Sequence, residues 1–388
     1  MKKPHSLVIV SKALAPYRVR FYSEVAKALL PYDWKVTLVV SALSAKDHPW
    51  KDPGKDNEAL EILGVGRTGE SSLSSRVIEF LLRPFNLRDI EFPNYSLLAV
   101  LEQQKADVVW THEYSPFCLA AAFWASFRDR YCLLSSDLGS TPPKHSCTAT
   151  QLKLHKAFSF LYQGVIAQTK EATRRTHPKG VPINFAPHAI DTDLYYPDPS
   201  KHSSVFRFLF AGGIRKEKGI ITLIEAGRLL ALEGNPFEVR IVGTGPLSGW
   251  LAGQSDSWLS IGGFIEGENL QKEYRSADAY VLPTEGDTYG VTIHEAAASG
   301  LPLIVGKTAG AVETLLSEGI SGFAIDAGDI RQLADRMRLL LSDPSLAKHM
   351  GLKAREAAEI LDIKSLGKQT ANFIRNITQS RNRTDHKR

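Results

Sequence analysis

The stretch from Val281 to Val305, VLPTEGDTYGVTIHEAAASGLPLIV, decides the fold. Its first three residues are typical of the end of a buried strand, and Leu301–Val305 are typical of the start of the next one. Between them, a turn at Thr288–Gly290 is followed by the Ala-rich run Val291–Ser299, which predicts a helix. Gly300 ends this helix, because glycine readily adopts the left-handed conformation that closes helices. The stretch therefore predicts a strand, a helix and a second strand of a parallel sheet.

The N-terminus of this helix is an expected anion site. Its first amides have no partner inside the helix, and the helix dipole adds a partial positive charge, so that such an end most often binds phosphate. Glu295 follows about 7 Å further along the helix axis. A phosphate at the amides would leave the Glu295 carboxylate near a hydroxyl of the attached sugar. The alternative for Glu295 is a solvated acid on the helix surface.

The composition describes a soluble globular protein of two domains. A chain of 388 residues is too long for one ordinary core and suits two α/β domains. The net charge of +5 permits an anionic substrate or an acidic membrane surface and requires neither. The three cysteines have no metal-binding spacing, and their odd number does not suit a disulfide framework. We expect a cytoplasmic protein, because no apolar run is long enough to span a bilayer.

The first half of the chain repeats strand and helix. Strands are expected at Ser6–Val10 and Trp34–Val40, with a helix at Phe21–Leu30 between them, which is the pattern of a doubly wound parallel sheet. Later strands bring this half to six expected strands; they are Ala106–Glu113, Tyr131–Asp137, Gly164–Gln168 and Asn184–Asp191.

The loop after the first strand, Ser11–Arg18, contains no G-x-G-x-x-G. This absence counts against a dinucleotide fold with its phosphates in this turn. The loop does place Pro16, Tyr17 and Arg18 at the carboxyl end of a strand, where ligands of such sheets bind. For Arg18, a surface charge at the start of a helix is the alternative.

Two later strands of this half end in polar side chains that reach the same sheet edge. His112 and Asp137 are the candidates for contact with a substrate, although a histidine in a loop is more often simply solvated.

The stretch from Ser71 to Asn94 leaves two interpretations open. Its aromatic and aliphatic residues alternate with Arg76, Arg83 and Arg88, a composition that could lie on an anionic bilayer surface. Pro84 interrupts it, however, and a helix packed on the sheet explains the apolar residues equally well.

A polar segment with two prolines, Tyr195–Ser204, predicts the domain boundary. We therefore expect an acceptor-side domain over 1–197 and a second domain over 205–360. A helix over 361–378 is expected to pack back toward the first domain. The basic, polar tail 379–388 is expected to be disordered.

The second half contains a further phosphate-binding candidate. Gly212–Gly219 (GGIRKEKG) lies between the strand Phe206–Ala211 and a helix from Ile220, and glycines with basic residues in such a turn suit a phosphate-bearing ligand. Charge in an exposed loop is the alternative. Gly243–Gly249 has the wrong spacing for a dinucleotide fingerprint, whereas Leu259–Ile265 is a plausible ledge for a flat ring.

These motifs together resemble the donor-binding domain of the retaining glycosyltransferases of family 4, glycosyltransferase group 1. The order and spacing of the matching pieces agree from Phe208 to about Met337; the pieces are FLFAGGIRKEKG, RIVGTGPL, IGGFI, Ala277–Val305, TAGAVET, GISGFAI and DIRQLADRM. The first half agrees more loosely, through APYR and through PHAIDTDLYYPDP, which is similar to the family's P-N-G-V-D-x-x-x-F-x-P. The resemblance implies the GT-B fold, in which two Rossmann-like doubly wound domains face each other across a cleft.

The resemblance also implies roles for individual carboxylates and for a lysine. Glu295 matches the second glutamate of the family's E-x7-E motif, which holds the nucleotide ribose. Asp287 stands at the first glutamate position, near the donor sugar, with a side chain one methylene shorter. Lys218 matches the lysine on the donor diphosphate. The family's sugar-contacting His-Asp is Ser136-Asp137 here, so that Asp137 keeps the acid and the histidine is absent.

The remaining donor contacts follow from the same resemblance. Phosphate amides would come from Gly290 and Val291, beside Tyr289, and the base ledge from Phe264 and Ile265. The family's usual arginine after the first glycine of the basic loop is replaced by Gly213, and Arg215 is the candidate to compensate.

The implied reaction is transfer of a sugar, with retention, from a UDP- or GDP-sugar to a saccharide or lipid-linked saccharide acceptor, in cell-surface polysaccharide or glycolipid biosynthesis. Lys218, Arg215 and the helix amides would compensate the leaving diphosphate without a metal or a further cofactor. Asp287 would orient the sugar, and domain closure would bring Tyr17 and Arg18 over the diphosphate. No nucleic acid partner is expected, and peripheral contact with the inner face of the plasma membrane stays open.

Two other functions stay open at this point. An epimerase or phosphorylase of the same fold would need several acid/base groups across the cleft, for which only His112, Glu113 and Asp137 are available. A non-catalytic nucleotide-sugar-binding subunit is favoured by Gly213 and Ser136, the two departures from the family pattern. A nicotinamide dehydrogenase fits least, because neither half carries the fingerprint.

Overall fold

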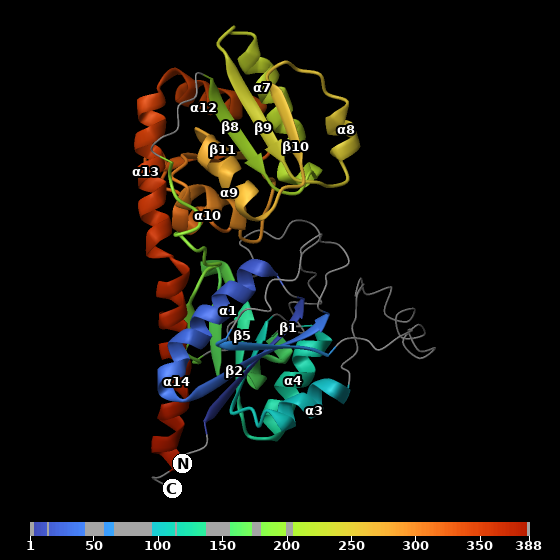
Figure 1. Cartoon of the computed structure of the whole chain (residues 1–388), viewed down its shortest axis with the longest axis vertical. Coiled ribbons are helices and arrows are strands. Elements are labelled where there is room, and N and C mark those ends of the chain that lie inside the picture. The colour runs from blue at the N-terminus through green and yellow to red at the C-terminus, as the bar shows by residue number, and fades with distance from the viewer. Residues whose placement is uncertain are drawn as a thin grey trace, which may run out of the picture.

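Two parallel sheets, each flanked by helices, form the molecule (Figure 1). The computed structural model describes residues 4–13, 15–42, 58–65, 95–112, 115–136, 156–172, 180–198 and 205–385. The first sheet has seven strands in the order β3-β2-β1-β4-β5-β6-β7, and the second has six in the order β10-β9-β8-β11-β12-β13. All strand pairs are parallel. This architecture confirms the predicted fold of two doubly wound α/β units.

The first sheet is built around β1, whose side chains alternate between two cores. The strands are β1 (His5–Ala13), β2 (Trp34–Ala42), β3 (Leu60–Gly64), β4 (Val108–His112), β5 (Tyr131–Ser136), β6 (Gly164–Ala167) and β7 (Ile183–Phe185). The helices are α1 (Pro16–Leu29), η1 (Leu30–Tyr32), α3 (Tyr95–Gln103), α4 (Pro116–Phe127) and η3 (Ser159–Leu161). Leu7 and Ile9 belong to the core cluster that contains residues of α1, whereas Val8 and Val10 belong to the cluster that contains residues of α3 and α4. A two-residue period therefore buries both faces of the strand.

Two details of this half differ from the sequence-based expectation. Helix α1 begins at Pro16 rather than at Phe21, because proline is well suited to the first helical turn. Tyr17 and Arg18 consequently lie in the first turn of a helix and not in a loop. The sheet has a seventh strand, β3, at its edge, which was not predicted because its one buried residue is followed by exposed and half-buried ones with no clear alternation.

The second sheet contains the stretch that decides the fold. Its strands are β8 (Phe206–Ala211), β9 (Phe237–Val242), β10 (Leu259–Gly263), β11 (Ala279–Leu282), β12 (Leu303–Gly306) and β13 (Gly322–Ile325). Its helices are η4 (Lys216–Lys218), α7 (Ile220–Ala231), α8 (Ser248–Ala252), α9 (Gly267–Ser276), α10 (Val291–Ala298), α11 (Val312–Leu315), α12 (Ile330–Ser342) and α13 (Pro344–Ile360). As predicted, Val281–Val305 supplies a strand, a helix and the neighbouring strand, and β11 pairs with both β8 and β12.

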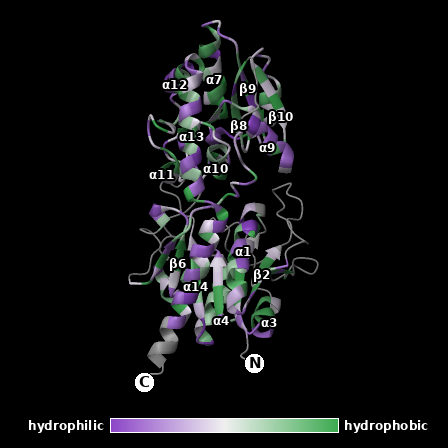
Figure 2. Cartoon of the chain, turned by 60° about the vertical axis from the view of Figure 1, so that its left-hand side comes forward, coloured by the Kyte–Doolittle hydropathy of each residue, from purple (hydrophilic) through white to green (hydrophobic). Residues whose placement is uncertain are grey.

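The C-terminal helix α14 (Ile363–Asp385) returns to the first sheet. It follows α13 along the same side of the molecule in both views, and Figure 2 shows apolar and polar residues interspersed along it. Leu366, Ile374 and Ile377 join the core cluster that contains α1. The helix runs as far as Asp385, into the basic, polar tail, and the expected disorder of 379–388 stays a prediction. The other domain limits stay predictions.

Surface contact with a membrane and passage through it concern different parts of the chain. The stretch 71–94 lies outside the described residues, so its membrane contact stays a prediction. Of the helices in the part of the chain that the structure describes, none combines the length and apolar character needed to cross a bilayer.

Truncation of Ile374 tests the docking of α14. This side chain is fully buried against the first sheet, so Ile374→Ala should lower the free energy of unfolding by about 2–4 kcal/mol. Urea denaturation followed by circular dichroism measures the change. Asn376→Ala, on the exposed face of the same helix, is the control and should stay within about 0.5 kcal/mol of the unmodified protein. Equal stability of both variants would contradict the packing of α14.

Candidate active site

The N-terminus of α10 is set by a left-handed glycine. Gly290 caps the helix with φ 92° and ψ 64°, and a Cβ atom there would lie 2.7 Å from Cδ1 of Ile293. A residue with a side chain would therefore be strained by the positive φ, and the Ile293 side chain would have to shift to make room. Helix α10 begins immediately after this glycine, beyond the carboxyl end of β11, which confirms the predicted helix at this position.

Lys218 and Asp287 meet beside this helix end. The Nζ atom of Lys218 forms an ion pair with Oδ2 of Asp287, and both side chains are largely buried. A Cβ atom on Gly290 would lie 3.7 Å from the same Oδ2 atom, so the carboxylate lies next to the start of α10. Three predicted site residues, which come from two different loops, are thus brought together.

The basic loop is fixed to the loop after β11 by its backbone. Gly219 has φ +75°, and a Cβ atom there would lie 2.0 Å from the carbonyl oxygen of Pro283. The carbonyl oxygen of Glu217 accepts hydrogen bonds from the Glu285 amide and the Thr284 hydroxyl, both at 2.9 Å. This close approach holds Lys218 opposite Asp287.

Arg215 lies beside the glycine that replaces the expected arginine. A Cβ atom on Gly213 would lie 3.5 Å from Nε of Arg215. The Arg215 side chain is exposed, so its guanidinium is accessible to a ligand at this loop. That Arg215 takes over from the missing arginine stays a prediction.

Glu295 is held between two tyrosine hydroxyls. Tyr195 donates a hydrogen bond to Oε1 at 2.9 Å, and Tyr274 donates one to Oε2 at 2.8 Å. The side chain is half-buried, and burial raises the pKa of Glu295 above its ordinary value, while the two tyrosines and Arg20 act in the opposite direction. Glu295 is therefore not a simply solvated helix acid. The sequence analysis did not identify the two tyrosines as its partners.

A row of aromatic rings connects the first sheet's helix α1 to the start of α10. The Tyr17 ring meets the His188 ring edge-on at 5.2 Å, and the His188 ring meets the Tyr289 ring at 5.0 Å, measured between centroids. The Arg18 guanidinium lies 5.7 Å from the centroid of the Tyr17 ring. Tyr17 and Arg18 are thus linked to the residue that precedes Gly290.

Buried histidines near this row stay neutral. Burial, followed by the charge of Arg18, lowers the pKa of His188 and of His112 well below the ordinary value. Burial also lowers the pKa of His294 to about 4. Nδ1 of His294 lies 2.9 Å from the carbonyl oxygen of His188, to which it donates a hydrogen bond. His188 and His294 consequently connect the two halves as neutral groups, through this hydrogen bond and the ring contact of His188 with Tyr289.

The other predicted contacts are less well defined. Phe264 is 43% exposed at the carboxyl end of β10, and Ile265 is half-buried beside it. His112 is buried at the end of β4, where its Nδ1 lies 3.2 Å from the Tyr22 hydroxyl, so it is not a solvated loop histidine. Asp137 lies outside the described residues, and Ser136 is buried at the end of β5.

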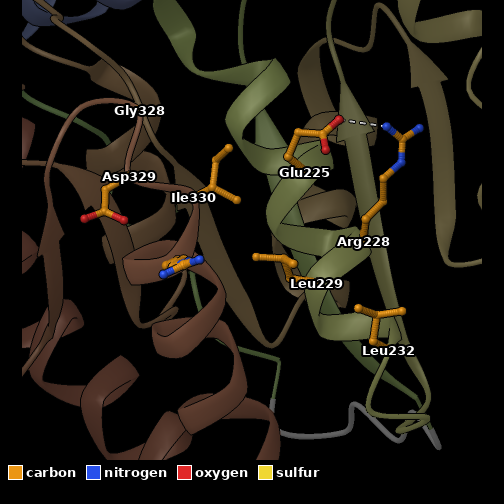
Figure 3. Close-up of a pocket in the computed structure, with 8 residues that line it drawn as sticks. Glu225, Arg228, Leu229, Leu232, Gly328, Asp329 and Ile330 are labelled. Carbon is orange, nitrogen blue, oxygen red and sulfur yellow. Dashed lines mark hydrogen bonds and ion pairs between the residues drawn. The ribbon is translucent and has the colours of Figure 1, made fainter.

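A surface pocket lies elsewhere in the second half, between α7 and the start of α12 (Figure 3). It contains none of the predicted site residues, and Glu225 on its wall pairs with Arg228 at 2.7 Å. Its lining residues are Glu225, Arg228, Leu229, Leu232, Gly328, Asp329, Ile330 and Arg331.

In the described part of the chain, no group of three or more histidine, cysteine, aspartate or glutamate side chains is arranged to hold a metal ion.

Comparison with known proteins agrees with this geometry. Residues 197–357 match the family model described as glycosyl transferases group 1. The sulfoquinovosyl transferase SQD2 of Arabidopsis thaliana is 33% identical over 102 residues, which are 26% of this chain and 20% of that protein. A GDP-mannose-dependent alpha-mannosyltransferase of Corynebacterium glutamicum is 25% identical over 292 residues, which are 70% of this chain and 67% of that protein. The chain spans less than half the length of the first curated relatives it matches.

The solved structures agree in fold across nearly the whole chain. The crystal structure of HepE from Anabaena in complex with UDP and glucose has a TM-score of 0.72 and 16% sequence identity, and covers 96% of this chain and 100% of that one. At this identity the likeness establishes the fold alone, which is the predicted GT-B arrangement. Residues 197–357 thus match the glycosyl transferases group 1 family, and nearly the whole chain shares the fold of the solved structure.

Proposed function

We propose that the chain is a retaining glycosyltransferase that moves a sugar from a nucleotide-diphosphate sugar to a saccharide or lipid-linked saccharide acceptor. The observation that carries the proposal is the meeting of Lys218 and Asp287 at the N-terminus of α10, with Glu295 further along the same helix. In such a donor the diphosphate joins the transferred sugar on one side to the ribose on the other. The site offers a cation with free amides, and one carboxylate on each side of them.

The ion pair supports separate roles for its two residues in the reaction, with Lys218 on the diphosphate and Asp287 on the sugar. Without a ligand, Lys218 and Asp287 neutralise each other. A bound diphosphate would draw the Lys218 ammonium to its oxygens and leave the Asp287 carboxylate to accept hydrogen bonds from the sugar hydroxyls. As the bond to the sugar breaks, negative charge grows on the diphosphate, where Lys218 and the α10 amides stabilise it.

No side chain in this scheme needs to act as a nucleophile. Asp287 is held by a lysine, and its proposed role is to orient the sugar. The acceptor hydroxyl would attack from the face that the diphosphate leaves, and the leaving phosphate oxygen would take the hydroxyl proton. This path retains the anomeric configuration, as the family resemblance implies.

The first half would contribute by covering the diphosphate. The aromatic row from Tyr17 through His188 to Tyr289 ends beside Gly290, which supports a role for Arg18 over the same phosphates. Such cover would exclude water and so suppress hydrolysis of the donor. The acceptor would enter from this side, where Asp137 stays a predicted contact.

The donor can be identified by its effect on stability. The proteins similar to this chain include a GDP-mannose-dependent mannosyltransferase and a protein solved in complex with UDP and glucose, so UDP- and GDP-sugars are the first to test. A ligand at about 100 times its Kd raises the free energy of unfolding by about 2.7 kcal/mol, which a thermal-shift panel detects. Acceptors drawn from cell-surface polysaccharide and glycolipid precursors can then be tested with that donor.

Removal of the lysine charge is the first test of the mechanism. With the donor identified by the panel, Lys218→Ala should lower kcat by about a hundredfold or more, because the leaving diphosphate loses its cation. Lys216→Ala removes an exposed lysine from the same short helix η4 and is the matched control, with activity close to that of the unmodified enzyme. Release of the nucleoside diphosphate measures both. Full activity of Lys218→Ala would contradict the assignment.

Glu295 should make donor binding depend on pH. The ionised carboxylate accepts hydrogen bonds from the ribose, and burial raises the pKa of Glu295 above its ordinary value. Affinity should therefore fall as pH drops through that raised pKa, at a higher pH than for an exposed glutamate. Calorimetric titration with an intact nucleotide-sugar measures this, because its diphosphate does not titrate in the same range.

The control for this pH dependence is Glu295→Gln, which keeps the size of the side chain and cannot ionise. It should bind more weakly at neutral pH and lose the dependence. A Glu295→Gln variant with the same pH profile as the unmodified enzyme would show that another group titrates.

A further inference from the structure

Residues 186–198 follow β7, the last strand of the first sheet, and this segment reaches the candidate active site through Tyr195. We propose that Tyr195 is a positioning residue, whose hydroxyl orients the Glu295 carboxylate so that both of its oxygens face the two hydroxyls of the donor ribose. The inference rests on the proposed function, since it assigns a supporting residue to the ribose contact of that same site.

Each oxygen of the Glu295 carboxylate accepts one hydrogen bond from a tyrosine. Tyr195 donates to Oε1 at 2.9 Å and Tyr274 donates to Oε2 at 2.8 Å. An ionised carboxylate offers about four acceptor positions, two on each oxygen, so each oxygen keeps one position. Two free acceptor positions on neighbouring oxygens match the 2′- and 3′-hydroxyls of a ribose, which are also neighbours.

Both tyrosine rings are fixed in the core. Tyr195 is 9% exposed and Tyr274 is fully buried, and both belong to the core cluster of the second sheet. Their rings pack edge-to-face, with centroids 5.7 Å apart. Burial and the charge of Glu295 raise the pKa of both tyrosines above the ordinary value, so both hydroxyls stay protonated and remain donors. Packing therefore fixes the direction from which each hydrogen bond comes.

Arg355 fixes the backbone of the same segment. Its Nη1 donates to the carbonyl oxygens of Thr192, Tyr195 and Ala298, the last of which is the final residue of α10. A guanidinium at a helix C-terminus is also favoured by the helix dipole. Two contacts thus bind this segment to α10. Arg355 binds it at the C-terminal end of the helix, and the Tyr195 hydroxyl binds it at Glu295, in the middle of the helix.

The position of Tyr195 in the family pattern indicates a variant that removes its hydroxyl without disturbing the fold. In the pattern P-N-G-V-D-x-x-x-F-x-P, which PHAIDTDLYYP resembles, Tyr195 stands where the family has phenylalanine. Tyr195→Phe should therefore fold normally and lose only the hydroxyl. Tyr196→Phe removes the hydroxyl of the neighbouring tyrosine, which is 45% exposed, and is the matched control.

The test compares ribose with a sugar that lacks both hydroxyls. Calorimetric Kd values are measured for UDP and GDP and for their 2′,3′-dideoxy forms, with the unmodified chain, Tyr195→Phe and Tyr196→Phe. Loss of a hydrogen bond that orients a charged group should weaken binding of the ribose form by about tenfold in Tyr195→Phe. Binding of the dideoxy form should not change, and Tyr196→Phe should match the unmodified chain with both ligands.

The outcomes separate this inference from the proposed function. If Tyr195→Phe weakens both forms equally, or weakens neither, Tyr195 does not orient the ribose contact and the inference is wrong, while the proposed function stands. If the unmodified chain binds the ribose form but does not prefer it to the dideoxy form, the assignment of Glu295 is wrong as well. If it binds no nucleoside diphosphate or nucleotide-sugar at all, the proposed function and the inference fail together.

Discussion

The left-handed turn at Gly290 is the constraint on which the rest of the site depends. Because this residue has no side chain, α10 can begin directly beyond the sheet edge, with its first amides free. The same turn brings Asp287 beside those amides, and the close approach of Gly219 to Pro283 brings Lys218 opposite Asp287. The left-handed conformation of Gly290 and the close backbone approach of Gly219 therefore assemble charges that lie 69 residues apart in the sequence.

The site is also where the two halves of the molecule communicate. His188 touches Tyr17 on one side and Tyr289 on the other, and its carbonyl accepts a hydrogen bond from His294 inside α10. Further contacts join Thr192 to Asp362, at the point where α13 gives way to α14. Movement of one half against the other would therefore act directly on the start and the middle of α10, which is a physical basis for linking domain closure to donor binding.

The sequence predicted most of the fold because buried parallel strands and amphipathic helices have distinct periods. The sequence did not predict elements whose hydrophobic pattern is weak, or side-chain contacts between residues that are far apart in the chain. β3 lies at the sheet edge and its burial does not alternate, and α1 starts earlier than expected because Pro16 suits a first turn. For the site, the loops of Lys218 and Asp287 were predicted, but their ion pair was not. The hydroxyls of Tyr195 and Tyr274 come from 100 and 21 residues away, and no spacing rule connects them to Glu295.

The central claim is that the N-terminus of α10 binds the diphosphate of a nucleotide-sugar. A crystal structure of the chain with its nucleoside diphosphate bound tests this most directly. The account predicts phosphate oxygens within hydrogen-bonding distance of the amides that follow Gly290, with Lys218 turned from Asp287 to the phosphates and the ribose hydroxyls on Glu295. A diphosphate bound elsewhere, with the ion pair of Lys218 and Asp287 intact, would contradict it.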